Sequence, residues 1–460
     1  MPKRIIAFII LFSFVFLCAC QPTPDEEYIV NKGDNKAGEL IEATPSVNAS
    51  GEPEAIVQPE FPEHWTDDIL TEYNEMVVDA DLIREDMEKY PVHLVARHTF
   101  TVEEAKHAAA CLFPQIKGYC VSDRMHAWRE FVEKDLAEVV SGDLPEETKK
   151  EHIPMLQDLL DNAVDMPEFV PVNSIEEIEA EFNTGYTVQL PDDTYGLFEI
   201  FYGYGINRLS VSTSRTGGLQ SKSMVESEDG GYDGEVDGYV EAELPLEDAI
   251  KHAEEFLEEL GIEGFVFNTA DEVRSIKVST LKVLGMGWNL QFLRTFGYTP
   301  IDTMMHEVST QGFGLHDDEA YSENWKMERI EIYVDGQGVQ HFVWDDPIED
   351  LGVVNENVQL LDFDSMKNII THTFYAALGN PDPVVGWYRI DRMVLTVTPQ
   401  TKKDSNEGYM MPTWICEIGY YHSNKNFLSF FRIPGGELRD DYFTVAFNAI
   451  DGTRMNLAGL

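Results

Sequence analysis

The chain has 460 residues, of which 43% are apolar, so it can bury a sizeable core over two or three domains and is not disordered as a whole. Its 83 acidic residues outnumber 33 basic ones and give a formal net charge of −50, which excludes nucleic-acid binding and direct adsorption to anionic lipid head groups. Solubility is the first interpretation of this acidity, and a basic partner or a cation-rich milieu is the second.

The first twenty residues have the pattern of an export signal. Lys3 and Arg4 precede an uncharged apolar run, Ile5 to Leu17, which is shorter than the roughly 20 residues of a membrane-spanning helix. The run ends in Leu17-Cys18-Ala19-Cys20, which resembles the lipobox of bacterial lipoproteins. The resemblance implies a signal peptide over residues 1–19 and a diacylglycerol on the thiol of Cys20. The alternative is an ordinary secretory signal in which Cys20 is incidental.

This resemblance predicts a location. We expect the chain to be attached through its N-terminal lipid to the extracytoplasmic face of the bacterial cell membrane. No second apolar run of this kind follows, so we expect the rest of the protein to be soluble outside that membrane. Residues 20–60 predict a flexible tether, because Gly, Pro, Ser, Asn and Glu dominate and too little apolar surface is available to offset the ordering entropy.

Residues 61–240 predict a helix-rich α+β domain. Thr101 is a suitable N-cap, with Glu103 and Glu104 in the first helical turn. From Gly185 the apolar period changes from helical to alternating. In chain order, the expected elements are a short helix or extended segment over Asp67–Glu88, a strand over Val92–Phe100, helices over Thr101–Leu112, Arg124–Val140 and Leu144–Ala163, and a hairpin over Leu197–Ser214.

Residues 241–460 predict a second α+β domain. Gly261 ends its first helix and Asp335-Gly336-Gln337-Gly338 is the turn of a hairpin. The expected helices are Leu244–Leu260 and Phe363–Leu378. The expected strands are Arg274–Val283, Trp288–Phe296, Ile330–Val334, Val339–Trp344, Tyr388–Thr398, Thr413–Tyr421, Phe427–Ile433 and Tyr442–Ile450. The predicted fold class is thus α+β, with a helix-rich N-terminal region followed by antiparallel sheets, each packed by a helix.

Two resemblances concern the second half of the chain. The helix starts at Leu244 and Phe363, the strands after them and the ending Asn448-Ala449-Ile450-Asp451-Gly452 resemble PepSY-type modules and related extracytoplasmic proteins that regulate sensor kinases. This implies PepSY-like units with a regulatory role. The stretches 338–344 and 357–363 resemble uncharacterised lipoproteins of gut Firmicutes, a family without an assigned activity, and support a location and a fold more than a function.

Three cysteines remain beyond the signal: Cys111, Cys120 and Cys416. Cys111 and Cys120 are close in sequence, and in an exported protein they can form a disulfide that closes a small loop. Two buried thiols are the equal alternative. Alternation in Trp414-Ile415-Cys416 makes Cys416 a core thiol of a strand.

The loop from Glu226 to Asp237 is the acidic cluster that best fits a cation. Its candidate calcium ligands are Asp229, Asp233, Glu235 and Asp237, because calcium takes six to eight oxygen ligands and the loop glycines allow wrapping. The spacing is not that of an EF-hand, and the alternative is a mobile hairpin loop. No other cofactor is expected.

Motifs of catalysis are incomplete. His306-Glu307 lacks the second histidine of a zinc protease, and neither a nucleophile elbow nor a phosphate loop occurs. The group Phe198, Phe201, Tyr202 and Tyr204 suits either a ligand face or a core. We therefore expect a protein that is not an enzyme and acts as a binding or regulatory module, with a partner protein in the cell envelope. The alternatives are a solute- or glycan-binding lipoprotein and a carboxylate-dependent hydrolase.

Overall fold

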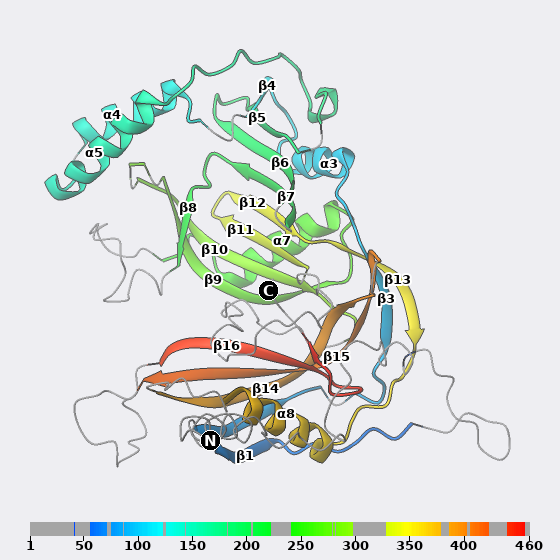
Figure 1. Ribbon diagram of the computed structural model, residues 1–460. Helices are drawn as coiled ribbons and strands as arrows, with labels where there is room; N and C mark the ends of the chain where they lie inside the picture. The colour runs from blue at the N-terminus through cyan, green and yellow to red at the C-terminus, as the bar shows by residue number, and fades with distance from the viewer. Residues whose placement is uncertain are drawn as a thin grey trace, which may run out of the picture.

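Two large β-sheets form the body of the molecule (Figure 1). The computed structural model describes residues 41, 56–70, 75–85, 87–122, 126–142, 144–181, 183–203, 206–221, 241–277, 279–280, 282–297, 328–378, 386–402, 405–422 and 439–455. Strands account for 45% of the structure and helices for 24%. The predicted α+β class with a helix-rich N-terminal region is therefore wrong, and the protein is mostly β.

Two segments that were assigned wrongly show why the prediction of the fold class failed. The segment Asp67–Glu88, for which a short helix remained an option, instead contains the end of β1 (His64–Leu70) and all of β2 (Glu75–Ile83), which pair in antiparallel fashion. Trp65 and Ile69 in β1 are buried while their neighbours are exposed, which is the period of two of a half-buried strand. The predicted strand 274–283 crosses a turn. The structure instead has β9 (Phe265–Lys277) and β10 (Lys282–Arg294).

The eight-stranded sheet combines the two ends of the described chain. Its path is β1-β2-β14-β15-β16-β17, and β3 joins β13 to β15. The β2–β14 pair is parallel, whereas the other pairs are antiparallel. Its remaining strands are β3 (Val92–Arg97), β13 (Ile348–Asn355), β14 (Gly386–Thr401), β15 (Glu407–His422), β16 (Arg439–Asn448) and β17 (Arg454–Met455).

The nine-stranded sheet is wholly antiparallel, in the order β4-β5-β6-β7-β12-β11-β10-β9-β8. It contains the two predicted hairpins, one over β6 and β7 and one over β11 and β12. Its remaining strands are β4 (Gly118–Val121), β5 (Gly185–Gln189), β6 (Tyr195–Gly203), β7 (Ile206–Thr213), β8 (Gly218–Ser221), β11 (Arg329–Asp335) and β12 (Gly338–Asp345).

The nine-stranded sheet is inserted into the eight-stranded one. The chain leaves the eight-stranded sheet after β3 and returns to it at β13, and these two strands pair with each other. Figure 1 shows β3 and β13 side by side where the two halves meet. Asn207 links the two segments that pass between the sheets, one after β3 and one before β13. Its Nδ2 donates to the His98 carbonyl (2.6 Å), and its own carbonyl accepts from the Asp346 N–H (2.7 Å). The predicted domain boundary after residue 240 falls between β8 and β9, which pair within the nine-stranded sheet.

Helices cover one face of each sheet. The helices α3 (Val102–Leu112) and α7 (Leu246–Glu259) share a core with the nine-stranded sheet, and α8 (Phe363–Leu378) shares one with the eight-stranded sheet. The predicted N-cap Thr101 is confirmed, since it forms a capping box with Glu104. The helices α4 (Arg129–Ser141) and α5 (Glu146–Asp161) form a projecting pair with its own small core, and a short 3₁₀ turn lies at Ile175–Glu177.

Part of the predicted tether lies against the body. Ile41 is 1% exposed within the core of the eight-stranded sheet, and its carbonyl accepts from Asn355 Nδ2 at 3.0 Å. Gln58 donates from Nε2 to Asn357 and to the Val358 carbonyl. Residues 41 and 56–60 thus belong to the folded part of the chain. Cys20 and most of residues 20–60 lie outside the described residues.

The contact between α3 and the sheet provides a test of this packing. Phe113, the C-cap of α3, is 2% exposed. A Cβ added to Gly196 in β6 would lie 2.4 Å from the Cζ atom of Phe113. We expect Gly196→Ala to lower the free energy of unfolding by about 1–3 kcal/mol, as overpacking of a core does. Urea unfolding measures this.

The matched control is Gly185→Ala in the neighbouring strand. A Cβ there meets its nearest atom, Glu199 Oε2, at 3.3 Å, and this side chain can move. We expect a change within about 0.5 kcal/mol. Equal effects of the two substitutions would contradict the close contact of Phe113 with Gly196.

Candidate functional site

The C-terminal end of α7 and the start of β9 enclose a surface hollow of about 210 Å³. The sequence explains how this end of the helix forms. Gly261 has φ +68°, its N–H donates to the Glu258 carbonyl, and the N–H of Ile262 donates to the Leu257 carbonyl. These two bonds are the Schellman motif, which requires a left-handed residue and therefore favours glycine. The predicted end of the helix at Gly261 is confirmed.

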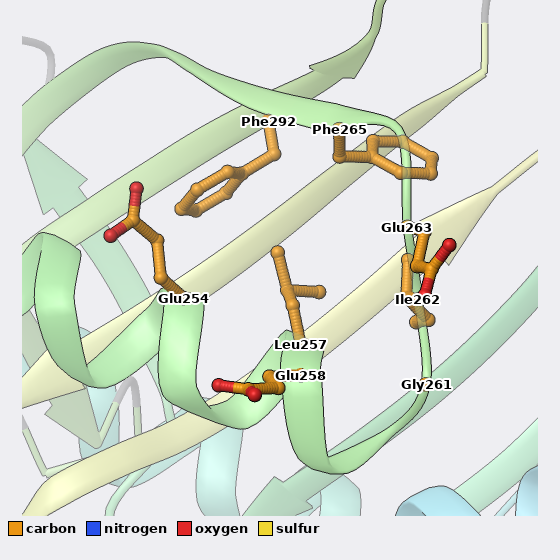
Figure 2. Close-up of a pocket in the computed structure, with 8 residues that line it drawn as sticks. All are labelled: Glu254, Leu257, Glu258, Gly261, Ile262, Glu263, Phe265 and Phe292. Carbon is orange, nitrogen blue, oxygen red and sulfur yellow. The ribbon is translucent and has the colours of Figure 1, made fainter.

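The floor of the hollow is apolar and its rim is acidic. Every polar side chain that lines it is a glutamate: Glu254 and Glu258 on α7, and Glu263 before β9. Figure 2 shows Leu257 between Glu254 on one side and Glu263 on the other, beside the two phenylalanine rings. The floor residues are Leu257, Ile262, Phe265 and Phe292, and Gly261 completes the lining.

The size of the hollow limits what it can hold. Small-molecule sites usually measure about 300–1,000 Å³. A hollow of about 210 Å³ suits one side chain better than a whole solute. An apolar floor with carboxylates at the rim is complementary to a positively charged group on an apolar stem, such as the side chain of lysine or arginine.

One aromatic ring of the hollow already binds a cation of this chain. The Arg294 guanidinium lies over Phe265, with its Cζ 4.6 Å from the ring centroid, and its Nη1 donates to the Glu263 carbonyl at 3.2 Å. Arg294 also forms a salt bridge with Glu328. The charge of this arginine is therefore neutralised by a buried partner, whereas Glu254, Glu258 and Glu263 are exposed.

Through Arg294, Glu328 connects the hollow to the segment between β12 and β13, where the chain passes from one sheet to the other. One of its oxygens accepts from Trp344 Nε1 (2.9 Å) and from the Ile348 N–H (3.2 Å), at the passage from β12 to β13. Burial raises the pKa of this carboxyl, while the Arg294 bonds act in the opposite direction. Because Glu328 is 4% exposed and fully bonded, it does not face a cleft as the acid of a hydrolase would.

A second polar cluster lies on the face of the nine-stranded sheet opposite α3 and α7. Arg208 binds Asp345 through two bonds of 2.6 and 2.9 Å, and Arg329 approaches the same carboxylate at 3.3 Å. Nearby, Ser210 Oγ lies 3.3 Å from His341 Nε2. Strand pairing explains these contacts, because Arg208 is directly opposite Asp345 in the ladder.

The Ser210–His341 pair has poor properties for nucleophilic catalysis. Burial first, and then the charge of Arg208, lower the pKa of His341 to about 4. A general base works best with a pKa near the operating pH. Among the described residues, no carboxylate bonds to the second nitrogen of this ring. The cluster fits an ion-pair network of the sheet.

The sequence-predicted sites are only partly described. Cys111 in α3 and Cys120 in β4 are both free thiols, and Cys416 in β15 is a buried core thiol as expected. The calcium candidates Asp229, Asp233, Glu235 and Asp237 lie outside the described residues, as do Cys20 and His306. Within the described part, no group of three or more His, Cys, Asp or Glu is arranged to hold a metal ion.

The aromatic group on β6 is spread between the core and the surface. Phe198 is 1% exposed in the core, Tyr202 is exposed and Phe201 lies between these extremes, while Tyr204 is not described. They therefore do not form one ligand face.

No helix in the described part of the chain is long and apolar enough to cross a bilayer.

The sequence contained a signal for the hollow that the motif search missed. Glu254 and Glu258 are four residues apart on α7, and Leu257 lies beside them, so the helical period alone places an acidic edge next to an apolar stripe.

Comparisons with family models, curated proteins and solved structures found no match to this chain.

The state of the thiols can be tested by alkylation. Burial raises the pKa of both Cys111 and Cys120 to about 11, and the nearby charge of Glu259 contributes for Cys111. Since only the thiolate reacts, we expect slow labelling by iodoacetamide at pH 7, with a rate that rises about tenfold per pH unit up to pH 10. Intact mass measures the labelling.

The control is labelling in urea without a reductant. All three thiols, Cys111, Cys120 and Cys416, should then react, because unfolding removes the burial that raises their pKa. If Cys111 and Cys120 accept the label only after reduction, the two are bridged by a disulfide, which contradicts the two free thiols of the structure.

Proposed function

We propose that this chain is a lipid-anchored extracytoplasmic binding protein without catalytic activity. It uses the hollow between α7 and β9 to hold the cationic, partly apolar side chain of a protein partner in the cell envelope. The observation that carries this proposal is the composition of the hollow, in which an aromatic and aliphatic floor is surrounded by no polar side chain other than glutamate.

The charge of the whole molecule supports a basic partner. With 83 acidic and 33 basic residues, the chain produces a negative field that attracts a cationic surface over several ångströms and accelerates its encounter. The hollow then adds short-range selectivity, because a carboxylate or a neutral side chain gains nothing from its rim. The lipobox resemblance at Cys20 supports anchoring at the membrane, and thus a partner in the cell envelope.

Binding of a cation in the hollow can be measured with butylguanidinium, which reproduces an arginine side chain. We expect saturation-transfer NMR to show weak binding to the full chain, and none of butyrate, which has a similar stem and the opposite charge. The double substitution Glu254→Gln with Glu258→Gln should weaken butylguanidinium binding about 3- to 10-fold, because two partly screened charge interactions are lost.

The matched control is Glu147→Gln with Glu151→Gln. These residues are also exposed and four positions apart on a helix, but they lie on α5, away from the hollow. The control should bind butylguanidinium as the wild type does. Equal weakening by both pairs would show that the cation responds only to net charge, which contradicts a site in the hollow.

The anchor is tested by removing its acceptor thiol. In a bacterial host, the Cys20→Ala chain should leave the membrane fraction and lose incorporation of labelled palmitate, because no lipid can be attached. Cys18→Ala is the control, since it keeps the thiol of Cys20 and should leave membrane attachment unchanged. A Cys20→Ala chain that stays in the membrane fraction would contradict lipid anchoring at this residue.

A further inference from the structure

The first half of β9 is an edge of the nine-stranded sheet. On one side β9 pairs with β10 along almost its whole length, from Phe265 to Lys277. On the other side the short strand β8 pairs only with Val273–Ile276. Among the described strands, none pairs with the outer side of residues 265–270. In every second one of these residues, the backbone N–H and C=O groups therefore point away from the sheet, where a further strand can bind them.

This edge begins inside the hollow. Phe265 lines the hollow and is also the first residue of β9. Val266 is 37% exposed, and residues 267–270 are partly exposed. Six residues of strand span about 20 Å, which is long enough for a short extended peptide to pair with them.

Two of the other edge strands, β13 and β1, are less suitable for pairing. The edge strand β13 has two register shifts within eight residues, which interrupt a regular ladder. The edge strand β1 carries Asp67 and Asp68, and charged side chains discourage added strands. The edge at 265–270 has one register shift, and neither Asp nor Glu occurs within it.

We infer that the partner binds by strand addition. An extended segment of the partner protein pairs with the outer edge of β9 at residues 265–270 and inserts a lysine or arginine side chain into the hollow at Glu254, Glu258 and Glu263. This inference rests on the proposed function and specifies its binding mode. Backbone hydrogen bonds to β9 supply affinity, and the cationic side chain in the hollow supplies selectivity.

The probe for this mode is an acetylated, amidated heptapeptide in which arginine and valine alternate. The alternation places all arginines on one side of an extended strand. We expect calorimetry to show that the full chain binds this peptide at least about tenfold more tightly than butylguanidinium, since backbone bonds are added to the side-chain contact. Hydrogen exchange of the amides at 265–270 should slow on binding.

N-methylation distinguishes strand addition from side-chain capture. A strand that adds to an edge turns the N–H groups of every second residue toward that edge. Of two peptides, each N-methylated at one alternate set of residues, one should lose at least tenfold in affinity and the other should bind as the parent does. If both bind equally well, strand addition is wrong. If Glu254→Gln with Glu258→Gln still weakens binding in that case, the proposed function stands.

Two substitutions on the β9–β10 hairpin provide matched controls. Val266→Lys introduces a charged side chain at the proposed edge, on the sheet face opposite the hollow, and should weaken peptide binding by about tenfold, because a lysine on an edge strand discourages the pairing of an added strand. Val283→Lys changes another exposed valine of the same hairpin, away from this edge, and should leave binding within about twofold. Equal affinity of the two variants would contradict docking at the edge. Failure of both the peptide and butylguanidinium to bind would overturn the inference and the proposed function together.

Discussion

The packing of α7 against the nine-stranded sheet determines the geometry of the proposed site. Ala249 and Ala253 are fully buried, and such small side chains let the helix lie close to the strands, while Phe256 and Leu257 fill the space beyond them. Gly261 then reverses the chain in a left-handed conformation, so that β9 starts directly beside the last helical turn. If the helix were one turn longer, Phe265 could not line the same hollow as Leu257.

A single cation relates this site to the junction of the two sheets. Arg294 lies over Phe265 at the hollow and is bound to Glu328, which in turn accepts hydrogen bonds at the passage from β12 to β13. The buried carboxylate has its bonding needs met only while both contacts are in place, and breaking such a buried pair is costly. The position of Phe265 is thus stabilised by the same network that fixes the return of the chain to the eight-stranded sheet.

The sequence predicts local elements better than their arrangement. The cap at Thr101, the helix end at Gly261 and the turn at Asp335–Gly338 were predictable because each depends on a few adjacent residues with strong conformational preferences. The pairing of β3 with β13 was not, since it joins residues about 250 positions apart and leaves no local pattern. The mostly β class was missed for a similar reason: well-capped helices give strong signals, whereas β1 and β2 alternate among many acidic residues. The acidic rim of the hollow was predictable from the helical spacing of Glu254 and Glu258. Its aromatic floor was not, because Phe265 and Phe292 come from β9 and β10 and meet the helix only in the folded protein.

The proposed hollow binds a cation between its carboxylates and its aromatic floor. A crystal structure of the full chain grown with butylguanidinium tests it most directly. We expect electron density for the guanidinium within hydrogen-bonding distance of Glu254, Glu258 or Glu263, with the butyl group against the apolar floor of the hollow. Density for the ligand at other acidic surfaces, with an empty hollow, would contradict it.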